Sequence, residues 1–257
     1  MTRIWIFLCL LGCTSIVSSQ THPVNGTALS TPKVIAFTHA SILLADGSTL
    51  TNGTLLISGD KILELGKSVT IPEDAIVYDL TGQTILPSFV ELNSSIGIPK
   101  AESNGGWSPR PQIESKKQGA YYWNESIHPE VDAATLYKSD EKAIDELRKM
   151  GYSVALTHLA DGIAQGTGTL VALDVKDENK VLLQSYAGQF FSLEKGVSRQ
   201  TYPSSQMGSI ALLRQVFYDL DWYTKSTQRE TDLSLEALER HTKLPMFFKT
   251  TDKWEIL

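Results

Sequence analysis

The chain has 257 residues, of which 42% are hydrophobic and 20% are charged. This composition is typical of a globular protein and excludes a disordered one. A net charge of −6 and a pI near 5.4 argue against a nucleic-acid-binding protein, which needs a basic face.

Residues 1–19 have the pattern of an export signal. Arg3 supplies a short basic region, and the apolar run Ile4–Leu11 is too short to span a bilayer. Small residues before Gln20 predict ordinary cleavage after Ser19, whereas the run ending at Cys13 resembles a bacterial lipobox. We favour cleavage before Gln20, because the apolar run before Cys13 is brief. The protein is then exported to the periplasm, with outer-membrane association if Cys13 is lipidated instead.

Residues 20–32 are polar and predict a linker, and residues 33–86 predict a β-rich domain. Short apolar runs alternate with turn signals such as Asp46-Gly47 and Asn52-Gly53. The spacing predicts a small antiparallel β-sandwich or barrel. The expected strands are residues 34–37, 41–44, 54–57, 62–65, 75–80 and 84–86.

Residues 99–129 form a long polar stretch rich in proline, glycine and aromatic residues. Connections of this length inside a domain are either functional or disordered. Two interpretations remain open: a ligand-binding wall for a sugar or peptide, or an insertion that packs on its own domain. The aromatic residues concerned are Trp107, Tyr121, Tyr122 and Trp123.

Beyond this stretch, helices alternate with strands. The first helix is expected to begin at the N-cap Ser139 and to stop before Gly151. Ser204 or Ser205 begins a second helix, which extends to about residue 223, and a third spans 233–241. Strands are expected at 152–158, 169–174 and 244–249, and the glycines around Thr167 favour a tight turn. The alternation predicts parallel βα units, most simply part of a (β/α)8 barrel.

The β-rich domain and the junction that follows it carry a family resemblance. The segments 40–47, 53–62 and 77–83, followed by Leu86-Pro87-Ser88-Phe89-Val90-Glu91-Leu92-Asn93-Ser94-Ser95, resemble the N-terminus of the amidohydrolase superfamily, most closely its imidazolonepropionase-like members. The resemblance implies a composite β-sandwich followed by a TIM-type barrel. It also implies hydrolysis of carbon–nitrogen bonds, with zinc expected in active members.

At the metal-binding positions of that family, this chain differs. The family has two histidines two residues apart at the end of the first barrel strand, where Asn93 and Ser95 stand instead. A later strand places another ligand histidine where Lys249 stands. An amide and a hydroxyl bind zinc poorly, so we expect a degenerate metal site and no metal or other cofactor in this segment.

Segments 157–171 and 198–209 resemble an exported bacteroidete-type branch of this family, with two modules in tandem. On that basis residues 87–257 are expected to be a partial barrel, truncated at the C-terminus. Its partners would be its own missing C-terminal region or a downstream module, and a small-molecule or peptide-like substrate.

Candidate catalytic residues outside the aligned positions are few. His158 ends a predicted strand, where barrel enzymes place catalytic groups, although a lone histidine is more often structural. His39, His128 and His241 show no ligand spacing with one another. Three classes of function therefore remain: a C–N bond hydrolase, a non-catalytic module that binds or supports an active one, and a glycan- or peptide-binding protein.

Overall fold

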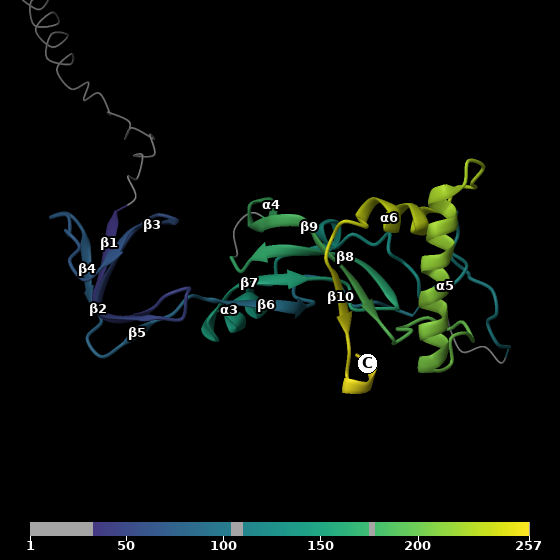
Figure 1. Cartoon of the computed structure of the whole chain (residues 1–257), viewed down its shortest axis with the longest axis horizontal. Coiled ribbons are helices and arrows are strands. Elements are labelled where there is room, and N and C mark those ends of the chain that lie inside the picture. Colours follow the sequence, from purple (N-terminus) through teal and green to yellow (C-terminus); the bar gives the residue numbers. More distant parts are fainter. Residues whose placement is uncertain (1–32, 104–109, 175–177, 257) are drawn as a thin grey trace, which may run out of the picture. The chain divides into compact units, whose positions relative to one another are not determined.

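The computed structural model describes residues 33–103, 110–174 and 178–256. The predicted export signal, the whole predicted linker (residues 20–32) and Trp107 lie outside these ranges. The chain divides into two compact units, with the boundary between Pro87 and Ser88 (Figure 1). Within the described ranges, none of the helices combines the length and apolar character that crossing a membrane requires.

The first unit contains a single five-stranded sheet. Its strands are β1 (Val34–Leu43), β2 (Thr49–Ser58), β3 (Lys61–Gly66), β4 (Ile76–Asp79) and β5 (Thr84–Ile85). The order is β3-β2-β1-β4, with β5 also paired to β1. The pairs β1–β2 and β2–β3 are antiparallel, as expected, but β4 and β5 run parallel to β1. The purely antiparallel arrangement was therefore wrong, because the chain crosses over before it pairs with the other side of β1.

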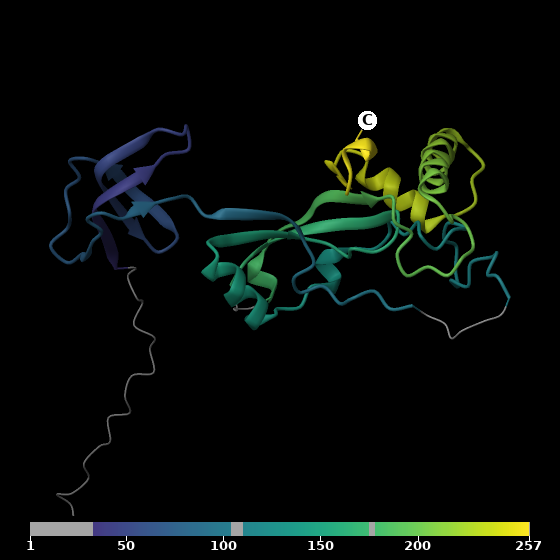
Figure 2. The ribbon, with the colours of Figure 1, turned by 90° about the horizontal axis from the view of Figure 1, so that it is seen from below.

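The second unit contains another five-stranded sheet and the helices. Figure 2 shows α3, in teal, on one side of this sheet. The elements are β6 (Phe89–Ser94), α2 (Ala133–Leu136), α3 (Glu141–Lys149), β7 (Tyr152–Thr157), β8 (Ala164–Ala172), α4 (Glu178–Val181), β9 (Leu182–Ser192), α5 (Gln206–Lys225), α6 (Leu233–His241), β10 (Met246–Lys249) and the short 3-10 helix η2 (Lys253–Glu255).

The strand directions in this second sheet differ from the expected parallel units. The order is β10-β9-β8-β7-β6. β6 is parallel to β7 and β9 is parallel to β10, but β8 is antiparallel to both of its neighbours. Four strands thus point the same way and β8 is inserted between them in reverse. The strand β9 was not expected from the sequence. It pairs antiparallel with β8, and antiparallel neighbours need no crossover helix between them.

The two faces of this sheet have different surroundings. Ala155 of β7 packs in a buried cluster with α3, and Phe191 of β9 packs in another with α5 and α6. The neighbouring residues Leu156 and Phe190 are buried but belong to neither cluster. Side chains alternate between the two faces of a strand. Ala155 and Phe191 therefore mark the face that the helices cover. We call the opposite face, which carries Leu156 and Phe190, the inner face.

Local signals predicted the three longer helices, α3, α5 and α6, but not the four-residue helices α2 and α4. Ser205 caps α5 by accepting a hydrogen bond from the backbone N–H of Gly208, as predicted. The cap of α3 was misassigned, since Asp140 rather than Ser139 accepts the N–H of Ala143. A carboxylate at this position also interacts favourably with the helix dipole.

The glycines around Thr167 form no tight turn, because they lie inside β8. Gly168 is required there by packing. A Cβ at this position would collide with the ring of Phe190 on the neighbouring strand. Glycine in a strand interior often marks such a close approach.

Candidate functional site

Polar side chains gather at one end of the second-unit sheet. Because β6, β7, β9 and β10 point the same way, their carboxyl ends lie at the same end of the sheet, where β8 begins. Parallel barrels and open α/β sheets bind ligands at this end. We call this region the strand-end site. Its polar residues are Asn93, His158, Gln165, Glu194 and Lys249.

His158 is fixed at the end of β7. Its backbone N–H donates a hydrogen bond to the carbonyl of Ser94 at 3.0 Å. Its ring stacks on that of Phe190, with centroids 3.7 Å apart and planes inclined by 10°. The side chain is only 1% exposed. Contacts with β6, through Ser94, and with β9, through Phe190, therefore determine the position and the orientation of the imidazole.

Burial also determines the charge of this imidazole. Desolvation disfavours the protonated form and lowers the pKa of His158 to about 4, an effect that the neighbouring Gln165 carboxamide partly offsets and the charge of Lys249 reinforces. At neutral pH, His158 is therefore uncharged. It carries one N–H donor and one nitrogen lone pair.

Gln165, which sequence reasoning missed, lies beside His158. Its side chain is 3% exposed, and its Nε2 donates to the carbonyl of Gly162 at 3.0 Å. Its Oε1 accepts no hydrogen bond of normal geometry from any described residue, but the carboxamide lies close enough to the His158 ring to act on the pKa of that ring as a hydrogen-bonding neighbour. The two buried side chains therefore offer polar atoms to each other. The local sequence gave one weak signal, a lone amide among small residues.

Lys249 ends β10 and reaches the same site. It is two residues after Phe247, whose ring stacks on Phe190 at 5.1 Å, so it lies on the inner face. Its Nζ is 3.6 Å from a carboxylate oxygen of Glu194, and these side chains are 40% and 65% exposed. An ion pair as exposed as this is weak, so the ammonium is accessible to a competing acceptor.

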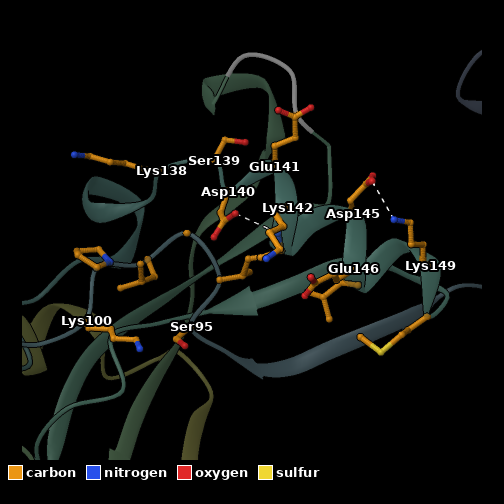
Figure 3. Close-up of a pocket in the computed structure, with 17 residues that line it drawn as sticks. Ser95, Lys100, Lys138, Ser139, Asp140, Glu141, Lys142, Asp145, Glu146 and Lys149 are labelled. Atoms are coloured by element: carbon orange, nitrogen blue, oxygen red, sulfur yellow. Dashed lines mark hydrogen bonds and ion pairs between the residues drawn. The ribbon is translucent and has the colours of Figure 1, made fainter.

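The two other aligned positions are not brought together on one strand. Asn93 lies in β6 and is exposed, and its backbone N–H donates to Glu91 at 3.0 Å. Ser95 lies beyond the end of β6, where it lines an open hollow of about 1150 Å³ beside α3 (Figure 3). The alternation that would let two side chains share one ion therefore does not extend to Ser95.

The hollow itself has no consistent charge. Figure 3 shows lysines and carboxylates mixed around it, with Asp145 and Lys149 paired at 3.4 Å. Its floor is formed by apolar residues of the segment after β6 and of α3. This surface does not select a cation or an anion. The charged residues that line it are Lys100, Lys138, Asp140, Glu141, Lys142, Asp145, Glu146 and Lys149.

Comparisons with known proteins agree with this architecture. No protein-family model matches the chain. An imidazolonepropionase from Streptomyces griseus is 27% identical over 161 residues, covering 57% of this chain and 37% of that protein. The crystal structure of an amidohydrolase from Thermotoga maritima superposes with a TM-score of 0.65 at 22% identity, covering 86% of this chain and 59% of the other. The chain is thus similar in sequence to an imidazolonepropionase and in fold to an amidohydrolase.

The chain spans only part of these amidohydrolases, 37% of the Streptomyces protein and 59% of the Thermotoga chain. Neither protein's activity therefore follows for this chain from likeness alone. What the strand-end site can do must be argued from its own residues.

The residues at the aligned positions do not fit the metal that an amidohydrolase resemblance implies. Zinc prefers several imidazole, thiolate or carboxylate ligands around one point. The part of the chain that the structure describes contains no group of three or more such residues placed to share an ion. Asn93, Ser95 and Lys249 offer instead an amide, a hydroxyl and an ammonium, and all three are poor zinc ligands.

The predicted aromatic wall is only partly formed. Tyr122 is buried, and its hydroxyl donates to Asp219 at 2.6 Å. The ring of Tyr121 contacts the ammonium of Lys117 at 3.9 Å. Trp123 is 50% exposed, and its ring stacks on that of Tyr202 with centroids 6.1 Å apart. Residues 121–129 are mostly buried against the second unit, whereas residues 110–120 are mostly exposed.

The remaining histidines lie apart from the strand-end site. His128 and Asp161 form a nearly buried pair, with Nε2 and Oδ2 3.4 Å apart. Burial acts to raise the pKa of Asp161, but His128 and backbone N–H groups outweigh it and leave that pKa lowered. His39 pairs with Asp79 in the first unit, and His241 stacks on Tyr186.

Proposed function

We propose that the chain is part of a hydrolase of the amidohydrolase type, acting on carbon–nitrogen bonds in cyclic or other non-peptide amides. The observation that carries the proposal is the combined likeness to an imidazolonepropionase in sequence and to an amidohydrolase in fold. The position of the polar residues supports it further. They lie at the carboxyl ends of the parallel strands, where barrel enzymes act.

We further propose that the metal site of this module is degenerate. Asn93, Ser95 and Lys249 cannot replace imidazole toward zinc, and Lys249 is paired with Glu194. In this proposal, the residues that bind the catalytic metal lie in another module, such as a downstream amidohydrolase module, and that module cleaves the substrate. We derive no metal-dependent step for the residues of this chain.

The second candidate is a non-catalytic module that binds ligand or supports an active partner. The same three residues favour it, because a barrel that has lost its metal ligands can retain its shape and its interactions.

We also propose that the protein is exported. Mass spectrometry of the mature N-terminus distinguishes cleavage before Gln20 from lipidation of Cys13.

The test combines metal analysis with assays of hydrolysis on the longest form of the protein that the host produces. We expect no stoichiometric metal bound through this module, and hydrolysis of at least one substrate in a panel of cyclic amides and dipeptides. Absence of both zinc and hydrolysis would contradict the hydrolase proposal. Stoichiometric metal that is lost in Asn93→Ala would contradict the degenerate site.

A further inference from the structure

A cavity of about 260 Å³ lies beside α6, on the helix-covered face of the second-unit sheet. Leu235 of α6 packs in one buried cluster with Phe191 of β9, and the carbonyl of His241 accepts a hydrogen bond from Nε2 of Gln189 at 2.7 Å. These contacts place α6 on the side of the sheet opposite the inner face. We call this cavity the α6 pocket. No residue of the strand-end site lines it.

The negative charge that lines the α6 pocket is only partly neutralised. Three carboxylates line it, those of Glu130, Asp132 and Glu236. Glu130 is ion-paired with Lys117, but neither Asp132 nor Glu236 has an ion pair with a cation among the described residues. Oε1 of Glu236 accepts a hydrogen bond from the Tyr223 hydroxyl at 3.2 Å. Its Oε2 accepts none from the part of the chain that the structure describes.

Arg240 follows Glu236 by one turn of α6 and lines the same pocket. Acidic and basic side chains four residues apart on a helix are close enough to pair, as Asp221 and Lys225 of α5 do at 2.7 Å. Glu236 and Arg240 do not pair in this way. Within residues 33–103, 110–174 and 178–256, the guanidinium of Arg240 has no hydrogen-bond or ion-pair partner. A carboxylate oxygen and a guanidinium that are both available to a ligand therefore line one cavity.

We propose that the α6 pocket binds a free α-amino acid with an apolar side chain, as the zwitterion, through Glu236 and Arg240. The ammonium group of the ligand donates to Glu236, and its carboxylate accepts from Arg240, whose planar guanidinium suits a carboxylate. The charge of Asp132 adds to the attraction for the ammonium group. Pockets for drug-sized molecules have volumes of about 300–1,000 Å³, so this smaller cavity suits a ligand of amino-acid size.

The uncharged walls of the α6 pocket suit an apolar side chain. The rings of Tyr186 and His241 lie with centroids 4.8 Å apart, and Leu233 adds an aliphatic surface. Burial and then the charge of Arg240 lower the pKa of His241, which Asp132 only partly offsets. The imidazole is therefore uncharged at neutral pH. It leaves the carboxylates of the pocket available to the ligand ammonium.

The experiment compares three probes by ligand-observed NMR titration of the purified protein. The probes are L-leucine, L-leucinamide, which lacks the carboxylate, and N-acetyl-L-leucine, which lacks the ammonium group. We expect L-leucine to bind at least about fivefold more tightly than either analogue, the effect of losing one charge-assisted interaction. Equal affinity of L-leucine and either analogue, or no binding of L-leucine, would overturn the proposal.

Variants assign each charge of the ligand to one side chain. Arg240→Gln should remove the preference over L-leucinamide, and Glu236→Gln should remove the preference over N-acetyl-L-leucine. Each variant should leave the affinity for the analogue in that comparison largely unchanged, which shows that the pocket is intact. A preference that persists in the corresponding variant would overturn the assignment.

The matched controls are Arg148→Gln and Glu141→Gln, which remove the same charges from the last and first turns of α3. Neither residue lines the α6 pocket, so both preferences should persist. Loss of a preference in its control would show that the charge acts outside the pocket and would also overturn the assignment.

The result is independent of hydrolysis, because the α6 pocket and the strand-end site share no residue. Binding of L-leucine without any turnover would support this pocket while contradicting the hydrolase proposal. Turnover by the protein, together with no binding of L-leucine, would do the reverse.

Discussion

Acidification should destabilise the second unit through His158. The pKa of this histidine falls from its ordinary value of 6.5 to about 4 on folding, because burial disfavours the imidazolium. Between pH 6.5 and about 4, His158 binds a proton in the unfolded chain but stays unprotonated in the folded chain. Stability is therefore lost as the pH falls from about 6.5 to about 4.

The size of the effect follows from the same two values. Linkage between proton binding and folding predicts that this single group lowers the free energy of unfolding by about 2.5 kcal/mol between pH 7 and pH 4.5. Carboxylates titrate over the lower part of this range, so the comparison must be made against a variant. His158→Phe keeps a ring to stack on Phe190 but cannot bind a proton.

The assay is urea unfolding of both proteins at several pH values, followed by tryptophan fluorescence. We expect the free energy of unfolding of His158→Phe, relative to the wild type, to rise by about 2.5 kcal/mol between pH 7 and pH 4.5.

Direct titration of the His158 ring by NMR provides a second measurement. A midpoint near 4 is expected. A midpoint near 6.5, or a difference between His158→Phe and wild type that stays constant with pH, would refute the argument that burial keeps this imidazole neutral.

Other substitutions test the packing around the site. Gly168→Ala should cost about 2 kcal/mol in urea unfolding, because the new methyl group meets the ring of Phe190; an unchanged midpoint would contradict this. Ser205→Ala should cost about 1 kcal/mol, because it removes the cap from Gly208, and a loss below measurement error would show that the cap is dispensable. The lowered pKa of Asp161 stabilises the folded chain above the ordinary value of 3.8, and this contribution is lost as the pH falls below that value. Asp161→Asn should lack this acid-dependent component, and an unchanged acid profile would exclude the carboxylate as its source.

Local patterns predicted the elements of this chain better than its topology. The polar-to-apolar boundary at Ser205 and the apolar periodicity after it gave α5, since capping and helix amphipathicity depend on neighbours within a few residues. The direction of β8 could not be obtained in this way. The direction in which a strand pairs depends on the path of the chain that connects it to its neighbour. The sequence of β9 also lacked a distinct strand pattern that would have indicated its pairing with β8.

The candidate site shows the same division. His158 could be singled out because it lies at the end of an expected strand, and Lys249 because it stands where the family resemblance places a ligand histidine. Gln165 could not, because its importance comes from its position beside the His158 ring and not from its place in a motif. The approach of these two side chains depends on the reversed strand β8.

The sequence by itself determined the amidohydrolase resemblance, the residue types at the aligned metal positions and the three longer helices, because these depend on composition and short-range order. Only the tertiary structure decided that β8 runs against its neighbours and that Ser95 lies beyond the end of β6. It also decided that His158 is buried and uncharged beside Gln165. Burial, strand direction and unsatisfied hydrogen bonds arise from contacts between residues distant in the chain, and no local pattern encodes them.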